Sequence, residues 1–294
     1  MTRLLSRIFI LLAVCFLPLS GAFRVAAAFG RQQYRVASTR VLDKLRAVIK
    51  SRLGLESRAA EELVKAIFER GALEQLEGGA FRFKSKKQIG SLIEIRGLQH
   101  LDHALEQGRG CILYSGHFRG RWSFIAKLGL LGYRPLLIRQ NAPPNMSRIY
   151  YWFQHRFDDL FSSKFDCRYL WVESPNPFVA IKASAHLRKN GVLITFIDIA
   201  SYANRVVEVD FLNRKEPFPE GTVVLSQLAR APLLGFSIHY PADKARYVGE
   251  ISLAHLAADN MLEATQQLAT RVESSIVSHP GDWGGWQKSQ YLRE

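Results

Sequence analysis

The sequence predicts an α/β protein with a mainly parallel central sheet flanked by helices. Short apolar runs suited to buried strands alternate with longer segments that have apolar residues at three- and four-residue spacing, as in helices. This alternation favours parallel strands joined by crossover helices. The expected strands lie near residues 110–115, 134–139, 168–172, 191–198 and 233–240, and the expected helices near 121–131, 146–157, 178–189, 221–230 and 258–278.

Two further amphipathic helices are expected before the first strand, over residues 39–53 and 57–77. The chain has 294 residues, of which 48% are hydrophobic, so it can bury one sizeable core. We therefore expect one α/β domain over residues 31–294, with a helical lead-in over 31–95.

The N-terminus carries an apolar run without charge at residues 8–23. At 16 residues it falls just short of the roughly 18 to 20 that span a bilayer, unless residues 25–29 join it past Arg24. A single span, a half-buried interfacial helix and a cleaved signal peptide are all compatible with this pattern, because Arg3 and Arg7 precede the run and small residues follow it.

We expect an uncleaved membrane anchor over residues 1–30. Three arginines follow the apolar run, at positions 24, 31 and 35, and only two precede it. Positive charge concentrates on the cytoplasmic side of a membrane segment, so the large C-terminal part is expected in the cytoplasm.

One expected strand delivers a histidine into a polar loop. In residues 108–124, GRGCILYSGHFRGRWSF, an apolar run is followed by His117 and then by Arg119 and Arg121. Loops at the carboxyl ends of the strands form the ligand crevice of an open α/β sheet. The helix that follows begins nearby, and its N-terminus favours negative charge. His117 is therefore a candidate general base beside an anion site.

The composition limits the remaining function classes. Lys plus Arg number 40 and Asp plus Glu 26, and this net charge of +14 suggests an anionic partner, although a soluble basic surface has the same composition. Nucleic acid is not expected, because no helix concentrates the charge beside base-reading residues. Three scattered cysteines indicate neither a disulfide framework nor a zinc site. The segment YSGHF lacks the G-x-S-x-G pattern of a serine hydrolase.

Four segments, in order, resemble one known family. Residues 97–122, GLQHLDHALEQGRGCILYSGHFRGRW, are similar to a stretch of the lipid A biosynthesis acyltransferases of the lysophospholipid acyltransferase superfamily. Residues 187–200 resemble that family's strand ending in an aspartate, here Asp198, and residues 209–238 resemble its next segment. The end of the chain, at residues 274–291, is similar to the family's closing I-x-x-x-P-x-x-W-x-W.

The resemblance implies a glycerolipid acyltransferase-like fold and an acyl transfer with His117 as the general base. The donor would be an acyl carrier protein or coenzyme A thioester, and the acceptor a hydroxyl of a lipid or glycolipid. The expected place is the cytoplasmic face of the bacterial inner membrane, in contact with membrane lipids. No metal and no cofactor is implied, since the acyl thioester is a co-substrate.

One position departs from the family pattern. The family places Asp or Glu five positions after the histidine, where this chain has Trp122, or Ser123 if one residue is inserted. Such a carboxylate orients the imidazole and stabilises its protonated form. Three alternatives follow: a differently assisted or unassisted histidine, a carboxylate from elsewhere such as Asp198 or Glu173, or a catalytically silent protein that binds an acyl lipid or acyl carrier protein.

The remaining candidate residues are assigned to substrate binding. Arginines suit phosphate by bidentate contacts, with a solvated basic loop as the alternative, and an aspartate at a strand end also suits a cap or loop anchor. The expected set is Arg119, Gly120, Arg121, Arg139, Asp198, Arg205, Gly221 and Thr222, with Arg205 facing an acidic donor.

Overall fold

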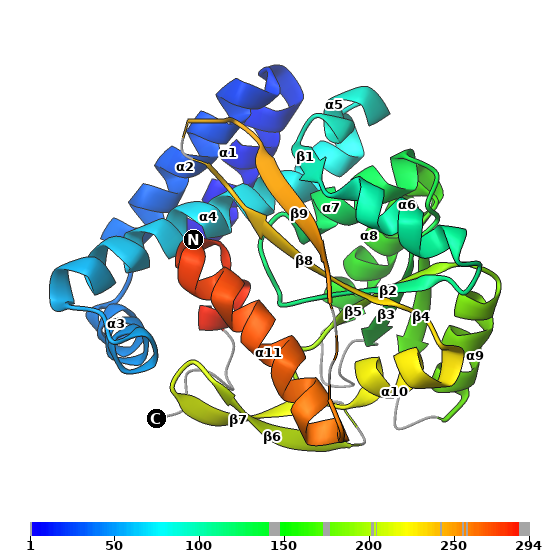
Figure 1. Cartoon of the computed structure of the whole chain (residues 1–294). Helices are drawn as coiled ribbons and strands as arrows, with labels where there is room; N and C mark the ends of the chain where they lie inside the picture. The colour runs from blue at the N-terminus through cyan, green and yellow to red at the C-terminus, as the bar shows by residue number, and fades with distance from the viewer. Residues whose placement is uncertain are drawn as a thin grey trace.

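The computed structural model describes residues 2–140, 148–172, 177–200, 203, 205–241, 243–254, 256 and 258–287. Seven strands form one sheet in the order β1-β9-β8-β2-β5-β3-β4 (Figure 1). Their bounds are β1 Ile93–Arg96, β2 Cys111–Ser115, β3 Leu136–Gln140, β4 Arg168–Val172, β5 Val192–Phe196, β8 Leu233–His239 and β9 Tyr247–Leu253. Every neighbouring pair is parallel except β8 and β9, so the predicted α/β class and mainly parallel sheet are confirmed.

The centre of the sheet is β2, which pairs with β8 on one side and β5 on the other. All five residues of β2 are buried. A continuous apolar run of this kind is expected where helices cover both faces of a parallel sheet. The five strands predicted from the sequence are all present at nearly the expected bounds.

The strands not predicted are β1, β9 and a separate antiparallel hairpin. The hairpin consists of β6 Val206–Phe211 and β7 Arg214–Pro219. Residues in β6 alternate between exposed or half-buried and buried, since one side of the hairpin packs against the domain and the other faces solvent. Mixed apolar and charged sequences of this kind lack the continuous apolar run by which the central strands are found.

Helices cover both faces of the sheet. Figure 1 shows α10 and α11 below the sheet and α7 and α8 above it. Phe124 of α7 stacks on Phe236 of β8 at 4.4 Å between ring centroids, which seals the upper face. The bounds are α5 Lys86–Gly90, α6 Leu98–Glu106, α7 Arg121–Leu130, α8 Arg148–Phe165, α9 Pro177–Arg188, α10 Gly221–Ala229 and α11 Met261–Ser278, followed by the 3-10 turns η1 Pro280–Asp282 and η2 Gly284–Gln287.

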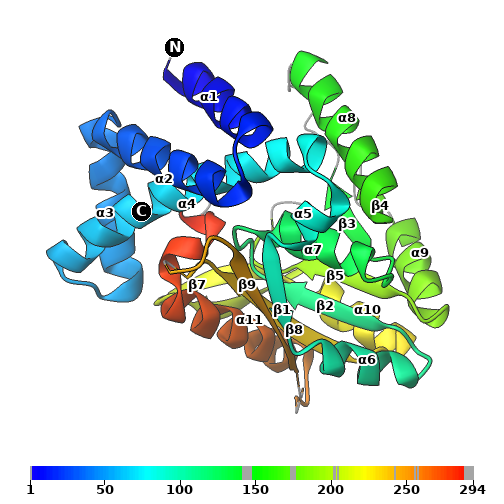
Figure 2. The same ribbon diagram turned by 90° about the horizontal axis from the view of Figure 1, so that it is seen from above.

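Four helices precede the sheet: α1 Thr2–Phe16, α2 Leu19–Arg35, α3 Thr39–Leu53 and α4 Ser57–Phe83. The two expected amphipathic helices are α3 and α4, although α4 runs on to Phe83. Glycine at position 30 lets α2 approach α4 closely, because a Cβ there would lie 2.5 Å from the Glu69 Cα. Helices α1, α2 and α3 each contact α4 (Figure 2).

The apolar run at residues 8–23 is not one helix. It is divided at Pro18, which precedes α2 and whose ring prevents a continuous helix through this point. Within the described part of the chain, no helix combines the length and the apolar character needed to cross a membrane. The anchor over residues 1–30 and the domain bounds remain predictions.

Candidate functional site

The loop after β2 holds His117 at the carboxyl edge of the sheet. Position 116 must be small, because a Cβ on Gly116 would lie 2.9 Å from Val272 and 3.4 Å from both Asp198 and Trp283. Helix α7 then begins at Arg121, after Gly120 in the left-handed region at φ 81°. The predicted path from strand to polar loop to helix is therefore present.

His117 contacts the carboxylate of Asp198. The two strands that carry these residues, β2 and β5, are parallel neighbours in a register that pairs Ser115 with Phe196. His117 lies two positions beyond Ser115, and Asp198 two positions beyond Phe196. The His117 Nδ1 lies 2.6 Å from the Asp198 Oδ1, and the backbone N–H of His117 donates to Oδ2 at 2.8 Å. The register of one strand pair thus builds a histidine–aspartate pair from residues 81 positions apart.

The surroundings hold Asp198 as a carboxylate. Its side chain is fully buried, and burial alone would raise its pKa. The charge that His117 carries when it is protonated, together with hydrogen bonds from His117 and from the Trp283 indole N–H at 2.8 Å, outweighs burial and lowers the pKa of Asp198 below its ordinary value. An ionised carboxylate can only accept hydrogen bonds, so the His117 Nδ1 that faces it carries the ring proton. The other ring nitrogen, Nε2, can then accept a proton.

The position of the imidazole is further restricted. The Phe196 ring lies 4.7 Å from the His117 ring, centroid to centroid. The histidine side chain retains 19% exposure, whereas Asp198 has none. The histidine is therefore the accessible member of the pair, and Asp198, predicted among the substrate-binding residues, is buried against it. The substrate contact of Asp198 stays a prediction.

The C-terminal turns hold the histidine loop through backbone hydrogen bonds. The backbone N–H of Gly284 donates to the His117 carbonyl at 2.8 Å, and the N–H of Arg119 donates to the Asp282 carbonyl at 2.8 Å. Phe118 and Trp283 form an isolated antiparallel bridge. The closing tryptophan segment has a recognisable pattern in the sequence, but its contact with the histidine loop has no local signal.

Two residues, Trp122 and Ser123, could correspond to the position of the family's carboxylate. Both contact other residues. The Trp122 ring packs edge-on against Phe157 and Phe161 of α8, with centroids 5.9 and 5.3 Å away. Ser123 is buried and donates to the buried Glu77 of α4. Burial raises the pKa of Glu77 to about 8, although the Ser123 hydrogen bond opposes this shift.

The two arginines beside the histidine both form ion pairs with the carboxylate of Glu74 on α4. Arg119 donates to the Glu74 Oε2 at 3.0 Å, and Arg121 to Oε1 at 2.5 Å. The side chain of Arg119 is 3% exposed and that of Arg121 is 17% exposed, so the alternative of a solvated basic loop is wrong. Of the two, Arg121 is the one that reaches the surface and can meet an anion.

Arg139, near the end of β3, occupies an aromatic cage. Its guanidinium lies 5.0 Å from the Trp122 ring and 5.4 Å from each of the Tyr169 and Trp171 rings, and it pairs with Asp158. Burial raises the pKa of Asp158 to about 6, which the charge of Arg139 opposes. Arg139 thus ties β3 to α8, and its predicted contact with the acceptor remains a prediction.

The other predicted residues have structural partners. Gly120 lies against the Tyr247 ring, where a Cβ would come within 2.7 Å, and the buried Thr222 hydroxyl donates to the Thr195 hydroxyl at 3.1 Å. Arg205 and Gly221 are exposed at the two ends of the hairpin region. Their substrate contacts, like those of the arginines above, stay predictions, and Glu173 lies outside the described residues.

The cysteines do not provide a nucleophile in this region. Burial raises the pKa of the Cys111 and Cys167 thiols to about 12, so both are neutral at physiological pH. Within the residues that the structure describes, no three His, Cys, Asp or Glu side chains gather as metal ligands. The described residues at this edge place an imidazole against a buried carboxylate.

Comparisons with known proteins agree with the resemblance. The sequence profile of the family described as bacterial lipid A biosynthesis acyltransferase matches residues 4–292. A lipid A biosynthesis acyltransferase of Haemophilus influenzae is 22% identical over 220 residues. That match covers 75% of this chain and 66%, just under two thirds, of the length of the relative.

Proposed function

The chain belongs to the bacterial lipid A biosynthesis acyltransferase family, and on that premise we propose that it transfers a fatty acyl group from a thioester to a hydroxyl of a lipid or glycolipid. The donor is an acyl carrier protein or coenzyme A thioester. The observation that carries the proposal is the pair formed by His117 and Asp198 at the carboxyl edge of the sheet. This pair favours an active enzyme over a silent protein that binds an acyl lipid or acyl carrier protein.

The geometry assigns a role to each atom of the pair. The His117 Nε2 takes the proton of the acceptor hydroxyl as the oxygen bonds to the thioester carbonyl carbon. The carbon–sulfur bond then breaks, and the leaving thiolate recovers the proton from Nε2. Asp198, at 2.6 Å from Nδ1, stabilises the imidazolium between these two steps. The reaction as written needs neither a metal nor a cofactor besides the thioester.

The acceptor reaches this site from an apolar surface nearby. Phe9, Leu12 and Phe16 of α1 are exposed, and Phe16 is 82% exposed. The exposed Phe83 ends α4 beside them, because the adjacent Lys84 donates to the Leu17 carbonyl at 3.0 Å. We call these four residues, Phe9, Leu12, Phe16 and Phe83, the α1 surface.

The α1 surface lies close to the histidine loop. Glu74, which holds Arg119 and Arg121, is nine residues before Phe83 on the same helix, or about 14 Å at 1.5 Å per residue. Exposed apolar side chains next to lysines suit the boundary between headgroups and acyl chains. We therefore place the protein on the inner membrane, with this surface in the interface and the α/β domain in the cytoplasm.

Vesicle flotation tests the membrane part of this proposal. Phe16→Asp puts a charge into the α1 surface, and we expect it to reduce the fraction of the full chain that floats with anionic vesicles. Phe178→Asp is the matched control, because Phe178 is also exposed but lies on α9. Equal flotation of wild type and Phe16→Asp would show that this surface does not bind the membrane.

Acyl transfer itself is tested with the membrane-reconstituted chain. Labelled acyl carrier protein or acyl coenzyme A is added with a total lipid extract, and mass analysis identifies what gains acyl mass. General-base help is typically worth 10² to 10⁴ in rate, so His117→Ala should lower transfer by about that factor. The control is His103→Ala, because His103 is an exposed histidine of α6. Equal transfer by wild type and His117→Ala would remove His117 as the base, and donor binding without any transfer would identify the silent protein.

The net charge of the chain supports the proposed partners. With a net charge of +14, the chain is expected to attract an acidic carrier protein and anionic headgroups. Exposed charges are screened beyond about 10 Å at 0.1 M salt, so association should weaken between low and high ionic strength. An association independent of salt would argue against charge-driven docking.

A further inference from the structure

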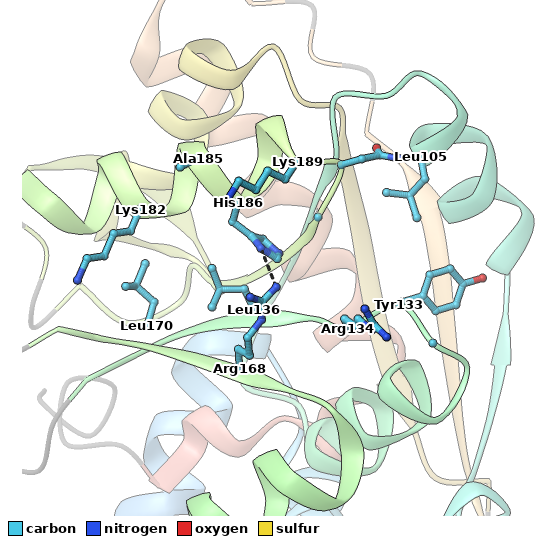
Figure 3. A pocket seen from close by; sticks show the side chains of 13 residues that line it. Leu105, Tyr133, Arg134, Leu136, Arg168, Leu170, Lys182, Ala185, His186 and Lys189 are labelled. Atoms are coloured by element: carbon cyan, nitrogen blue, oxygen red, sulfur yellow. Dashed lines mark hydrogen bonds between the residues drawn. The ribbon is translucent and has the colours of Figure 1, made fainter.

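A cavity lies at the opposite edge of the sheet from His117. Its volume is about 610 Å³, and its walls come from the starts of β3 and β4, the residues before β5, the end of α6 and one side of α9 (Figure 3). His117 follows the carboxyl end of β2, whereas this cavity lies at the amino ends of the strands. A five-residue strand spans about 17 Å, so the sheet separates the two sites.

Basic side chains from several elements surround this cavity. Lys182, His186 and Lys189 recur at intervals of four and three residues along and just beyond α9, and so share one side of the helix. Arg134 and Arg168 come from the segments that begin β3 and β4. This side of α9 faces the cavity, as Figure 3 shows, and is therefore more than a solvated helix surface.

The positive charge of this cavity is only partly compensated. Asp166 pairs with Arg134 at 2.9 Å. Among the described residues that line the cavity, none is acidic. Arg168, Lys182 and Lys189 therefore provide an excess of positive charge that suits a dianion better than a single carboxylate.

The histidine in the wall is held neutral and positions Arg168. The His186 Nε2 donates to the Val192 carbonyl at 3.1 Å, which leaves Nδ1 to accept from Arg168 at 3.4 Å. Burial, with the nearby charge of Arg168, lowers the pKa of His186. Position 191 must be glycine for this ring to fit, because a Cβ there would lie 2.3 Å from the His186 Nε2. The His186 ring is thus packed into the wall, whereas the side chains of Arg168, Lys182 and Lys189 are exposed and accessible to a ligand.

The floor of the cavity is apolar. Leu105, Leu136 and Leu170 line it together with Ala185. Both Leu136, the first residue of β3, and Leu170, in the middle of β4, are buried. A ligand that satisfies both parts of the cavity carries a compact anionic group and an apolar portion.

We propose that this cavity binds a soluble organic phosphate monoester, with the phosphate among Arg168, Lys182 and Lys189 and the apolar portion on the leucine floor. A lipid headgroup offers the same phosphate chemistry, but the position of the cavity favours a free molecule. Helix α6, which contributes Leu105, lies at the opposite end of the molecule from α1 and its exposed apolar residues (Figure 2). The inference is independent of the acyl transfer proposed above.

Calorimetric titration of the full chain with phenyl phosphate tests this inference, because the probe combines a dianion with an apolar ring. Inorganic phosphate and benzyl alcohol each supply half of that chemistry and should bind at least tenfold more weakly. A charge-assisted hydrogen bond is worth about 1.5 kcal/mol or more, so each of Lys182→Ala and Lys189→Ala should weaken phenyl phosphate binding about tenfold. Arg188→Ala is the matched control, since Arg188 is exposed on α9 but does not line the cavity.

Three outcomes would overturn the inference. They are no binding of phenyl phosphate by wild type, equal binding by wild type and the two lysine variants, and equal loss in Arg188→Ala. Flotation with phosphatidylglycerol vesicles separates the two phosphate sources. The double variant Lys182→Ala/Lys189→Ala should float as wild type does, and a loss of flotation would assign the cavity to lipid headgroups.

Discussion

Replacing Asp198 with asparagine should reverse the tautomer of His117. The Asp198 Oδ2 accepts two hydrogen bonds at 2.8 Å, one from the His117 backbone N–H and one from the Trp283 indole N–H. An asparagine NH₂ group at that point would face two donors. Leaving buried donors unsatisfied costs about 1–3 kcal/mol each, so the amide oxygen is held there by roughly 2–6 kcal/mol.

This orientation of the amide changes the group that faces the His117 ring. With the amide oxygen facing Trp283, the NH₂ group of the introduced asparagine takes the place of Oδ1, 2.6 Å from the His117 Nδ1. Nδ1 must then accept, and the proton moves to Nε2. Nε2 can no longer take a proton from the acceptor hydroxyl, and the same reversal in a serine protease triad lowers kcat by about 10⁴. We expect Asp198→Asn to lower acyl transfer by about 10³ to 10⁴.

Two measurements test this reasoning. The first is kcat for acyl transfer in the reconstituted system, with Asp210→Asn as the control because Asp210 is an exposed aspartate paired with Lys215. The second is the ¹⁵N spectrum of the His117 ring, which reports the protonated nitrogen directly. Activity within tenfold of wild type, or a proton still on Nδ1 in a folded Asp198→Asn variant, would refute the assignment.

Three further predictions follow from the same region. Trp283→Phe removes one charge-assisted hydrogen bond from Asp198 but keeps an aromatic ring, so kcat should fall about tenfold with KM unchanged, and an unchanged kcat would count against this positioning role. Glu77 has its pKa raised from 4.5 to about 8, so its folded form holds a proton that the unfolded form has lost, and stability should decline as the pH rises from about 4.5 to about 8. Between pH 5 and pH 8 the free energy of unfolding of Glu77→Gln, measured with denaturant, should decline less than that of wild type, by of order a few kcal/mol. An identical decline in the two proteins would mean that Glu77 is ionised in the fold. Trp122→Glu should not raise kcat, because the His117 Nδ1 already contacts Asp198, and a gain in kcat would show that the Asp198 contact does not assist the proposed base.

The central sheet was predictable because its strands are covered on both faces. Strands of this kind are continuous apolar runs between turn signals, as β2 and β5 are, and five of them were found at nearly their observed bounds. The edge strand β1, with the sequence IEIR, and the alternating strand β6 carry charged residues, so their pairing depends on neighbours that are distant in the chain. Pro18 is a local signal that divides the apolar N-terminal run. No local signal indicates that both halves pack onto α4.

The loop that carries His117 shows what the sequence alone does not determine. The local pattern was enough to place His117 just after one buried strand and to indicate a general base at the ligand edge of the sheet, and the family resemblance placed Asp198 at the end of another expected strand, over residues 191–198. Sequence left open which carboxylate, if any, serves the imidazole, because a parallel sheet can order its strands in many ways. Only the folded chain makes β2 and β5 neighbours and pairs Ser115 with Phe196, and this register places the residues two positions beyond each strand side by side. The residue types were therefore determined locally, and their contact was decided by strand order, which depends on packing across the whole sheet.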